Sequence, residues 1–148
     1  MSLKVDMDLE KIGHIYLAAP LFTRGEIAFN LELYKYLTEE GYRVFLPQKE
    51  CEKAKGEDIY KTCLRGLQSS AIVIAILDGA DADSGTCWEC GYAASRNIPI
   101  IAVRTDFRIS GDTGGFNAML YYSAEKVIVN DENVFEAIVR ELKLLKIS

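Results

Sequence analysis

The sequence predicts an α/β protein with one doubly wound domain, in which helices flank a five-stranded parallel sheet. Two apolar runs rich in β-branched residues, 71–77 and 98–103, are typical of strands buried on both faces of a sheet. Segments with the apolar periodicity of a helix alternate with such runs, which is the pattern of βαβ units. At 148 residues the chain has the length of one such domain, and we expect residues 1–148 to form it.

Each helix and strand is predicted from its pattern of apolar residues and from the residues that end it. Gly41 and Pro47, for example, are typical of a helix end and a strand end. The expected strands cover 13–19, 42–46, 71–77, 98–103 and 126–129. The expected helices cover 26–40, 58–69, a segment from Gly85-Thr86 to Arg96-Asn97, and 133–145. This order favours a flavodoxin-like or Rossmann-like fold.

The remaining segments are predicted as irregular structure. We expect a lead-in at 1–11, a charged loop at 48–57 and a loop over a pocket at 104–115. A short apolar segment at 116–120 carries Asn117, which we expect to be a buried amide.

Charge and hydropathy exclude several classes of partner. The net charge is -5 and the pI is about 5.0, which argues against binding to a nucleic-acid polymer or an anionic membrane surface. An uncharged nucleoside stays compatible with this charge. No apolar stretch is long enough to span a bilayer, and the first residues do not resemble a signal peptide. We therefore expect a cytoplasmic protein.

The cysteines and glycines suggest neither a metal nor a nucleotide cofactor. Cys87 and Cys90 form a C-x-x-C, but this pair falls inside a predicted helix and the chain has one histidine, His14. We expect the four cysteines to be reduced, mostly structural thiols. No G-x-G-x-x-G or Walker motif is present, so we expect no cofactor.

The segment 78–95 is the main candidate for chemistry. Asp78, Asp81 and Asp83 follow a predicted buried strand, and ligands bind at the carboxyl ends of such strands. Thr86 is a candidate N-cap with Glu89 three residues later, the spacing of a capping box. Either Glu89 caps its own helix, or it faces a pocket with other carboxylates that raise its pKa.

Two chemistries suit such a pocket. One is glycosyl transfer, in which one carboxylate attacks the sugar carbon and another acid protonates the leaving group. The other is phosphoryl transfer with carboxylate-bound Mg²⁺. Because no phosphate cradle is prominent, the sequence favours glycosyl transfer. Tyr16, on the first predicted strand, is either a core tyrosine or a site residue.

Four segments in this order resemble the nucleoside 2-deoxyribosyltransferase family: Ile15–Phe22, Leu77-Asp-Gly79, Asp83-Ser-Gly-Thr-x-x-Glu-x-Gly-Tyr-Ala93 and Asn117–Leu120. The resemblance implies that Glu89 is a nucleophile that forms a covalent deoxyribosyl ester. It implies that Asp83 assists proton transfer to the leaving base and that Tyr16 orients the nucleophile. The implied substrates are 2′-deoxynucleosides and free nucleobases.

The resemblance also implies a shared site. Asn117 matches an asparagine that reaches the sugar 5′-hydroxyl from a neighbouring subunit, so a homodimer or a larger homo-oligomer is expected. Cys63 departs from the family, which usually has aspartate or asparagine there to bind the base. The candidate substrate-binding residues are Asn117, Gln48, Asp78, Phe22, Cys63, Gly85 and Met119.

Two other functions stay open at this level. One is hydrolysis of the N-glycosidic bond of 2′-deoxynucleoside 5′-monophosphates, for which Arg24, Arg104 or Arg108 would pair with the phosphate. The other is a non-catalytic module that senses a nucleoside or nucleotide. Asn117 favours a free nucleoside over the monophosphate.

Overall fold

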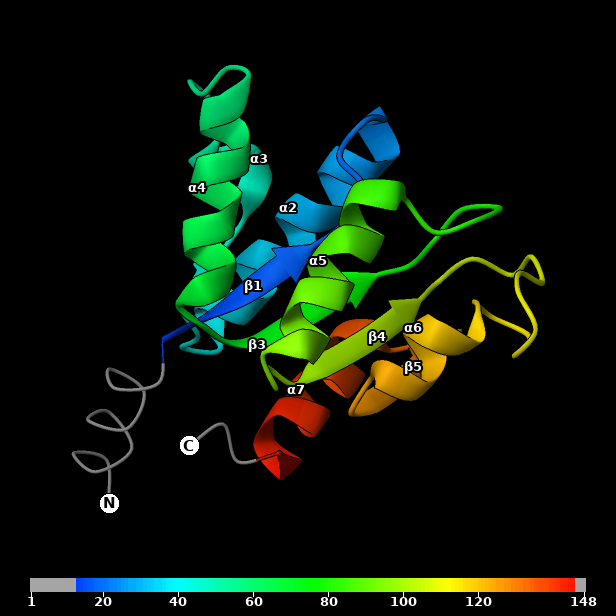
Figure 1. Ribbon diagram of the computed structural model, residues 1–148. Coiled ribbons are helices and arrows are strands. Elements are labelled where there is room, and N and C mark those ends of the chain that lie inside the picture. Colours follow the sequence, from blue (N-terminus) through cyan, green and yellow to red (C-terminus); the bar gives the residue numbers. More distant parts are fainter. Residues whose placement is uncertain (1–12, 146–148) are drawn as a thin grey trace.

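The computed structural model describes residues 13–145, which form a five-stranded parallel sheet in the order β2-β1-β3-β4-β5 (Figure 1). The strands are β1 (His14–Ala18), β2 (Val44–Phe45), β3 (Ser70–Ile76), β4 (Ile100–Arg104) and β5 (Lys126–Val129). The predicted fold class and strand number are thus confirmed. The chain moves outward in one direction from β1 to β2 and in the other from β3 to β5. This reversal between β1 and β3 is the place where doubly wound sheets bind ligands.

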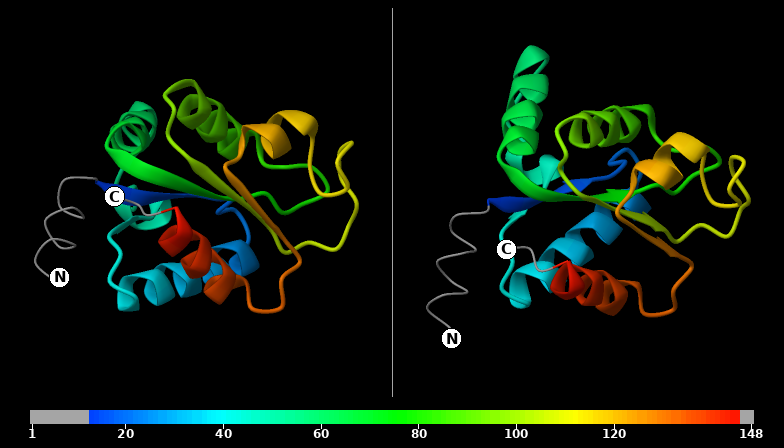
Figure 2. Two further views of the ribbon diagram at one scale, coloured as in Figure 1. Left: turned by 90° about the horizontal axis from the view of Figure 1, so that it is seen from below. Right: turned by 60° about the horizontal axis from the view of Figure 1, so that its bottom comes forward.

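Helices cover both faces of the sheet (Figure 2). On one face lie α2 and α7, and on the other lie α4, α5 and α6. The bounds are α2 (Arg24–Glu39), α3 (Pro47–Glu50), α4 (Glu57–Gln68), α5 (Ser84–Ser95), α6 (Ala118–Ser123) and α7 (Val134–Leu144).

Alternation along β1 divides the core into two layers. Ile15 and Leu17 pack with the α2 and α7 layer, whereas Tyr16 and Ala18 point to the face covered by α4 and α5. Successive side chains of a strand point to opposite faces, so this assignment follows from the position of each residue. It places the Tyr16 ring on the same side of the sheet as α5.

Two local expectations were wrong. The helix expected at 26–40 begins at Arg24, because Thr23 is the N-cap and forms a capping box with Glu26. The expected loop at 48–57 begins with a helical turn, α3, whose first residue is Pro47. The expected lead-in at 1–11 lies outside the described residues. Within 13–145, no helix has both the length and the apolar character to cross a bilayer.

Candidate active site

The side chains of Tyr16 and Glu89 meet above the sheet. Tyr16 lies in the middle of β1, is completely buried and stacks on Phe45 with ring centroids 5.1 Å apart. Its hydroxyl donates a hydrogen bond to Oε2 of Glu89. Because β1 and the stacked Phe45 ring fix the tyrosine, this bond fixes the orientation of the carboxylate.

Glu89 lies in the second turn of α5 and its environment favours the protonated form. Burial is the main cause that raises the pKa of Glu89 to about 7; the hydrogen bond from Tyr16 opposes this increase, and the charge of Asp83 adds to it. The carboxyl group therefore changes charge close to neutral pH. A carboxylate with a pKa in this range can act both as a nucleophile and as a leaving group.

Tyr16 remains a hydrogen-bond donor at all moderate pH values. Burial, the charge of Glu89 and the hydrogen bond to it raise the pKa of Tyr16 far above its ordinary value, with a smaller contribution from Cys63. The hydroxyl can orient Glu89 without itself giving up a proton.

Asp83 is the N-cap of α5, a position that the sequence had assigned to Thr86. The Asp83 Oδ2 atom accepts hydrogen bonds of 3.0 Å from both the backbone N–H and the hydroxyl of Thr86. The expected capping box between Thr86 and Glu89 was therefore wrong. The N-cap, Asp83, lies three residues before Thr86. The Glu89 side chain therefore does not cap the helix, and it points toward Tyr16.

A cavity of about 300 Å³ opens beside Glu89 between α4 and α5. Most of its wall is apolar, and Gly85 leaves one side of it without a side chain. Trp88 contacts Tyr60 edge to face and stacks on Tyr92. The cavity is lined by Ile59, Tyr60, Cys63, Leu64, Leu67, Gly85, Trp88 and Glu89.

Two of these lining residues were missed by the sequence analysis. Trp88 directly precedes Glu89 in α5, and Tyr60 lies on the same stripe of α4 as Cys63 and Leu67. Both aromatic side chains are about half exposed. An apolar stripe along a helix normally indicates core packing. The sequence alone therefore does not distinguish it from a stripe that partly lines a cavity.

The structure places two predicted binding residues in internal networks. Gln48 accepts a hydrogen bond from the buried Asn30 amide and donates one to the Ile27 carbonyl. Asp78 accepts from the backbone N–H and hydroxyl of Thr105 and from the N–H of the next residue. Gln48 thus connects α3 to α2, and Asp78 connects the loop after β3 to the loop after β4.

Three further candidates lie on the surface. Phe22 is 75% exposed and Met119 is 81% exposed. Asn117 is also exposed, so the expected buried amide was wrong, and its Oδ1 accepts from the N–H of Leu120 as the N-cap of α6. The free amide nitrogen of Asn117 stays available to a group outside the helix.

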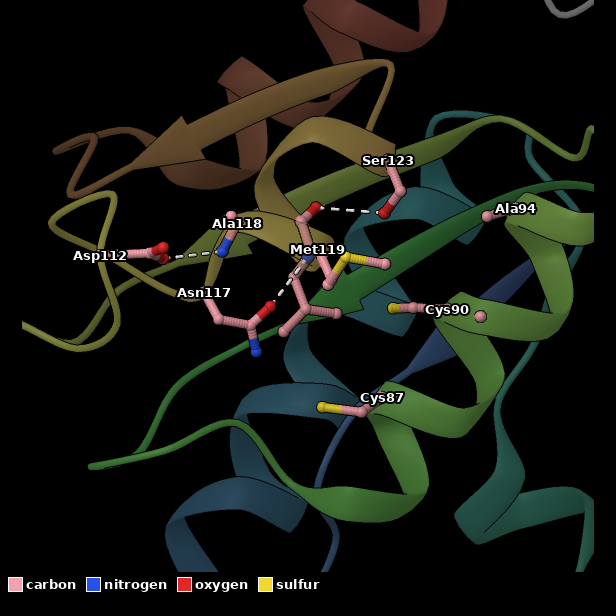
Figure 3. Close-up of a pocket in the computed structure, with 10 residues that line it drawn as sticks. Cys87, Cys90, Ala94, Asp112, Asn117, Ala118, Met119 and Ser123 are labelled. Carbon is pink, nitrogen blue, oxygen red and sulfur yellow. Dashed lines mark hydrogen bonds between the residues drawn. The ribbon is translucent and has the colours of Figure 1, made fainter.

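Asn117 and Met119 line a second cavity of about 520 Å³ between α5 and α6. Figure 3 shows them facing Cys87 and Cys90 of α5. This cavity and the one beside Glu89 lie on opposite sides of α5, so a single chain does not bring Asn117 and Glu89 into one cavity.

Two of the three arginines expected to bind phosphate have internal roles. Arg104 is 1% exposed and donates to the carbonyls of Leu77, Gly79 and Arg108. Arg108 forms an ion pair with Asp106 and lowers the pKa of that carboxyl group well below its ordinary value. Of the three, only Arg24 at the exposed start of α2 has no such bond among the described residues. For the same range, 13–145, no cluster of three histidine, cysteine or acidic side chains is arranged to hold a metal ion.

Comparisons with known proteins show the family of this chain. The model of the family described as "Nucleoside 2-deoxyribosyltransferase" matches residues 15–136. No curated protein is similar enough in sequence to count as a relative.

Several solved structures have the same fold. A conserved protein of Enterococcus faecalis has a TM-score of 0.72 at 23% identity and covers 88% of this chain and 99% of its own. A 2-deoxyribosyltransferase of Bacillus psychrosaccharolyticus has a TM-score of 0.68 at 24% identity, and the match covers 85% of this chain and 90% of the transferase chain. A CMP N-glycosidase of Clostridium botulinum has a TM-score of 0.60 at 18% identity, and the match covers 89% of this chain and 98% of the glycosidase chain.

The family match extends from β1 through β5, and its range includes Tyr16, Asp83, Glu89 and Asn117. This chain belongs to the nucleoside 2-deoxyribosyltransferase family.

Proposed function

We propose that the protein transfers 2-deoxyribose from one nucleobase to another through a covalent ester on Glu89. The Glu89 carboxylate attacks C1′ of a 2′-deoxynucleoside, and the N-glycosidic bond breaks with its electron pair on the base. Asp83 assists protonation of that base. A second base then attacks C1′ and gives up its N–H proton, which Asp83 assists in accepting, while the ester bond breaks and the carboxylate is released.

The observation that carries this proposal is the hydrogen bond from Tyr16 to Glu89 beside an apolar cavity. The bond engages Oε2, which leaves Oε1 to form the new bond to carbon. The aromatic side chains of Tyr60 and Trp88 offer surfaces on which a planar base can stack. In this proposal the nucleophile, Glu89, is adjacent to the subsite for the base.

A second candidate is hydrolysis of the glycosidic bond of a nucleoside monophosphate. The fold shared with a CMP N-glycosidase and the exposed position of Arg24 favour it. The buried Arg104 counts against it, since its guanidinium donates to three backbone carbonyls, and the exposed Arg108 guanidinium is already paired with Asp106. A sensor of nucleosides is the third possibility, and it predicts ligand binding with no turnover.

The deciding experiment is a base-exchange assay. Deoxyinosine and free adenine are incubated with the protein, while deoxyadenosine monophosphate and CMP are incubated with it in separate reactions. We expect new deoxyadenosine in the first reaction. Release of base from a monophosphate, without exchange in the first reaction, would establish the hydrolase instead.

Variants separate a transferase from a sensor. Glu89→Ala should abolish exchange while nucleoside binding persists, and Glu52→Ala, an exposed carboxylate in another loop, should leave exchange unchanged. Ligand binding without any turnover by the wild type would show that the protein is a sensor.

A further inference from the structure

Cys51 and Cys63 are a pair of free thiols in contact. Their Sγ atoms are 3.6 Å apart, although the residues are twelve positions apart in the chain. Cys51 is the C-cap of α3, and Cys63 lies in the middle of α4. Both side chains are partly exposed, so a small reagent can reach the pair.

This pair lies at the wall of the cavity beside Glu89. Cys63 lines that cavity and is one of the groups that raise the pKa of the Tyr16 hydroxyl. The Glu89 charge in turn contributes to the raised pKa of Cys51, after the larger effects of burial and of Cys63. Any change in the bonding of these two sulfurs therefore occurs next to the proposed nucleophile.

We propose that Cys51 and Cys63 form a disulfide when the protein meets a peroxide. Cys63 attacks first because it lines the cavity that a peroxide can enter. Its sulfur bonds to one peroxide oxygen, the O–O bond breaks, and the other oxygen leaves as water with the thiol proton. The Cys51 sulfur then displaces the oxygen on Cys63, which leaves as a second water with the Cys51 proton.

The bond requires the two sulfur atoms to approach each other. A disulfide has an S–S length of about 2.05 Å, so the 3.6 Å separation must shorten by about 1.5 Å. Cys63 is on the same helix as Ile59, Tyr60 and Leu64, which line the cavity. Closure of the disulfide therefore shifts the wall of the proposed base subsite, and this consequence rests on the proposed function.

The C-x-x-C pair is a poorer candidate for oxidation. Cys90 is 2% exposed and packs in the core under α5. The Cys87 thiol donates toward the carbonyl of Ala82, and the described residues show no contact between its sulfur and that of Cys90. The structure thus predicts that one specific pair of the four cysteines becomes linked.

The test counts thiols and maps the linkage. The full-length protein is treated with millimolar hydrogen peroxide, quenched by alkylation and digested without reduction for mass spectrometry. We expect the number of free thiols to fall from four to two and a Cys51–Cys63 peptide to appear. Burial of Cys51 raises the pKa of its thiol, so the second step, in which Cys51 attacks the oxidised Cys63, should proceed faster at higher pH.

Variants and reversal complete the design. Cys51→Ser should prevent the linked peptide, whereas Cys87→Ser should leave it unchanged. If the exchange activity is present, peroxide should lower it at least about tenfold, because a shift of about 1 Å at a catalytic site can cost that much. Dithiothreitol should restore it, because reduction of the disulfide returns both thiols.

The two readouts fail separately. A Cys87–Cys90 linkage, or four free thiols after treatment, would overturn the proposed modification site whether or not the protein is a transferase. Formation of the Cys51–Cys63 disulfide in a protein that shows no exchange activity before peroxide or after reduction would overturn the proposed function and leave the modification site established.

Discussion

The Tyr16 hydroxyl donates a hydrogen bond to the Glu89 carboxylate, which joins the middle of β1 to the second turn of α5. The two residues are 73 positions apart in the chain. The bond stabilises the carboxylate form of Glu89, while burial and the Asp83 charge favour the protonated form. The protonation state of the proposed nucleophile is thus set by three named groups, and each can be altered.

The first prediction concerns the pH dependence of exchange. Glu89 must be ionised to attack, so kcat/KM should rise as the pH increases through about 7. Tyr16→Phe removes the bond that lowers the pKa, so the rising limb should move to higher pH. Asp83→Asn keeps an N-cap but removes a negative charge, so the limb should move to lower pH. Initial exchange rates from pH 5 to about 9 measure both shifts, and a limb that stays in place in both variants would exclude Glu89 as the titrating group.

Unfolding experiments give a check that needs no activity. The folded protein binds the Glu89 proton more tightly than the unfolded chain, so the stability that this group contributes is largest below pH 4.5. It is lost as the pH rises from there to about 7. The wild type should therefore lose stability relative to Glu89→Gln over this range, measured by urea unfolding.

The second prediction concerns the choice of base. The cavity beside Glu89 has apolar and aromatic walls, and the Cys63 thiol stands where the resemblance described in the sequence analysis implies an amide or carboxylate. Acceptor bases should therefore be ranked by their stacking surface more than by their hydrogen-bonding edge. Adenine and benzimidazole, which share a bicyclic shape, should react at rates within about tenfold of each other, since a missing hydrogen bond to an apolar wall costs little.

Cys63→Asp is the matched variant for this prediction. It should restore a preference for bases with amino groups, because the new carboxylate accepts hydrogen bonds. Acceptor panels read by chromatography measure the change. A wild-type protein that rejects benzimidazole while accepting adenine would show that polar contacts select the base.

The third prediction concerns Asp78. Its carboxylate accepts three hydrogen bonds from Thr105 and Asp106, which connect the loop after β3 to the loop after β4. Asp78→Ala should lower the free energy of unfolding by about 1–3 kcal/mol, because it leaves these donors without a partner. Asp81→Ala, in the same loop but exposed, should have a smaller effect. Thermal unfolding of the two variants compares them, and equal losses would show that the Asp78 bonds are unimportant.

The fourth prediction concerns assembly. Asn117 and Glu89 line different cavities of one chain, and Asn117 is exposed. If the site combines Glu89 of one copy with Asn117 of another, Glu89→Ala and Asn117→Ala should each be inactive alone. Mixing them should restore activity, since a mixed dimer contains one site with both residues intact. A mixture that stays inactive despite subunit exchange would place both residues in a site within one chain.

The sequence predicted the fold because strand and helix signals agreed along the chain. The apolar runs that became β3 and β4 are buried on both faces, and the five strands pair in parallel as expected. Boundaries were less accurate where a single capping side chain decides them. Asp83 and Thr86 are both good N-caps, and only the three-dimensional structure shows that Asp83 occupies that position.

The site was predicted in part, and by different routes. Local spacing alone left Glu89 between a capping role and a pocket role, and the hydrogen bond from Tyr16 decides between them. Pairing of Asp78 with Thr105 could not be predicted, because it depends on how two loops meet after folding. The contact between Cys51 and Cys63 is likewise a product of how α3 packs against α4.

The most direct test of the account is to detect the covalent ester. The protein is mixed with deoxyinosine without an acceptor base, quenched in acid, digested with pepsin and analysed by mass spectrometry. We predict that one deoxyribosyl group is attached to the peptide that contains Glu89, and that the adduct disappears when adenine is added before the quench. Base exchange without any adduct on this peptide, or an adduct on another residue, would contradict the role assigned to Glu89.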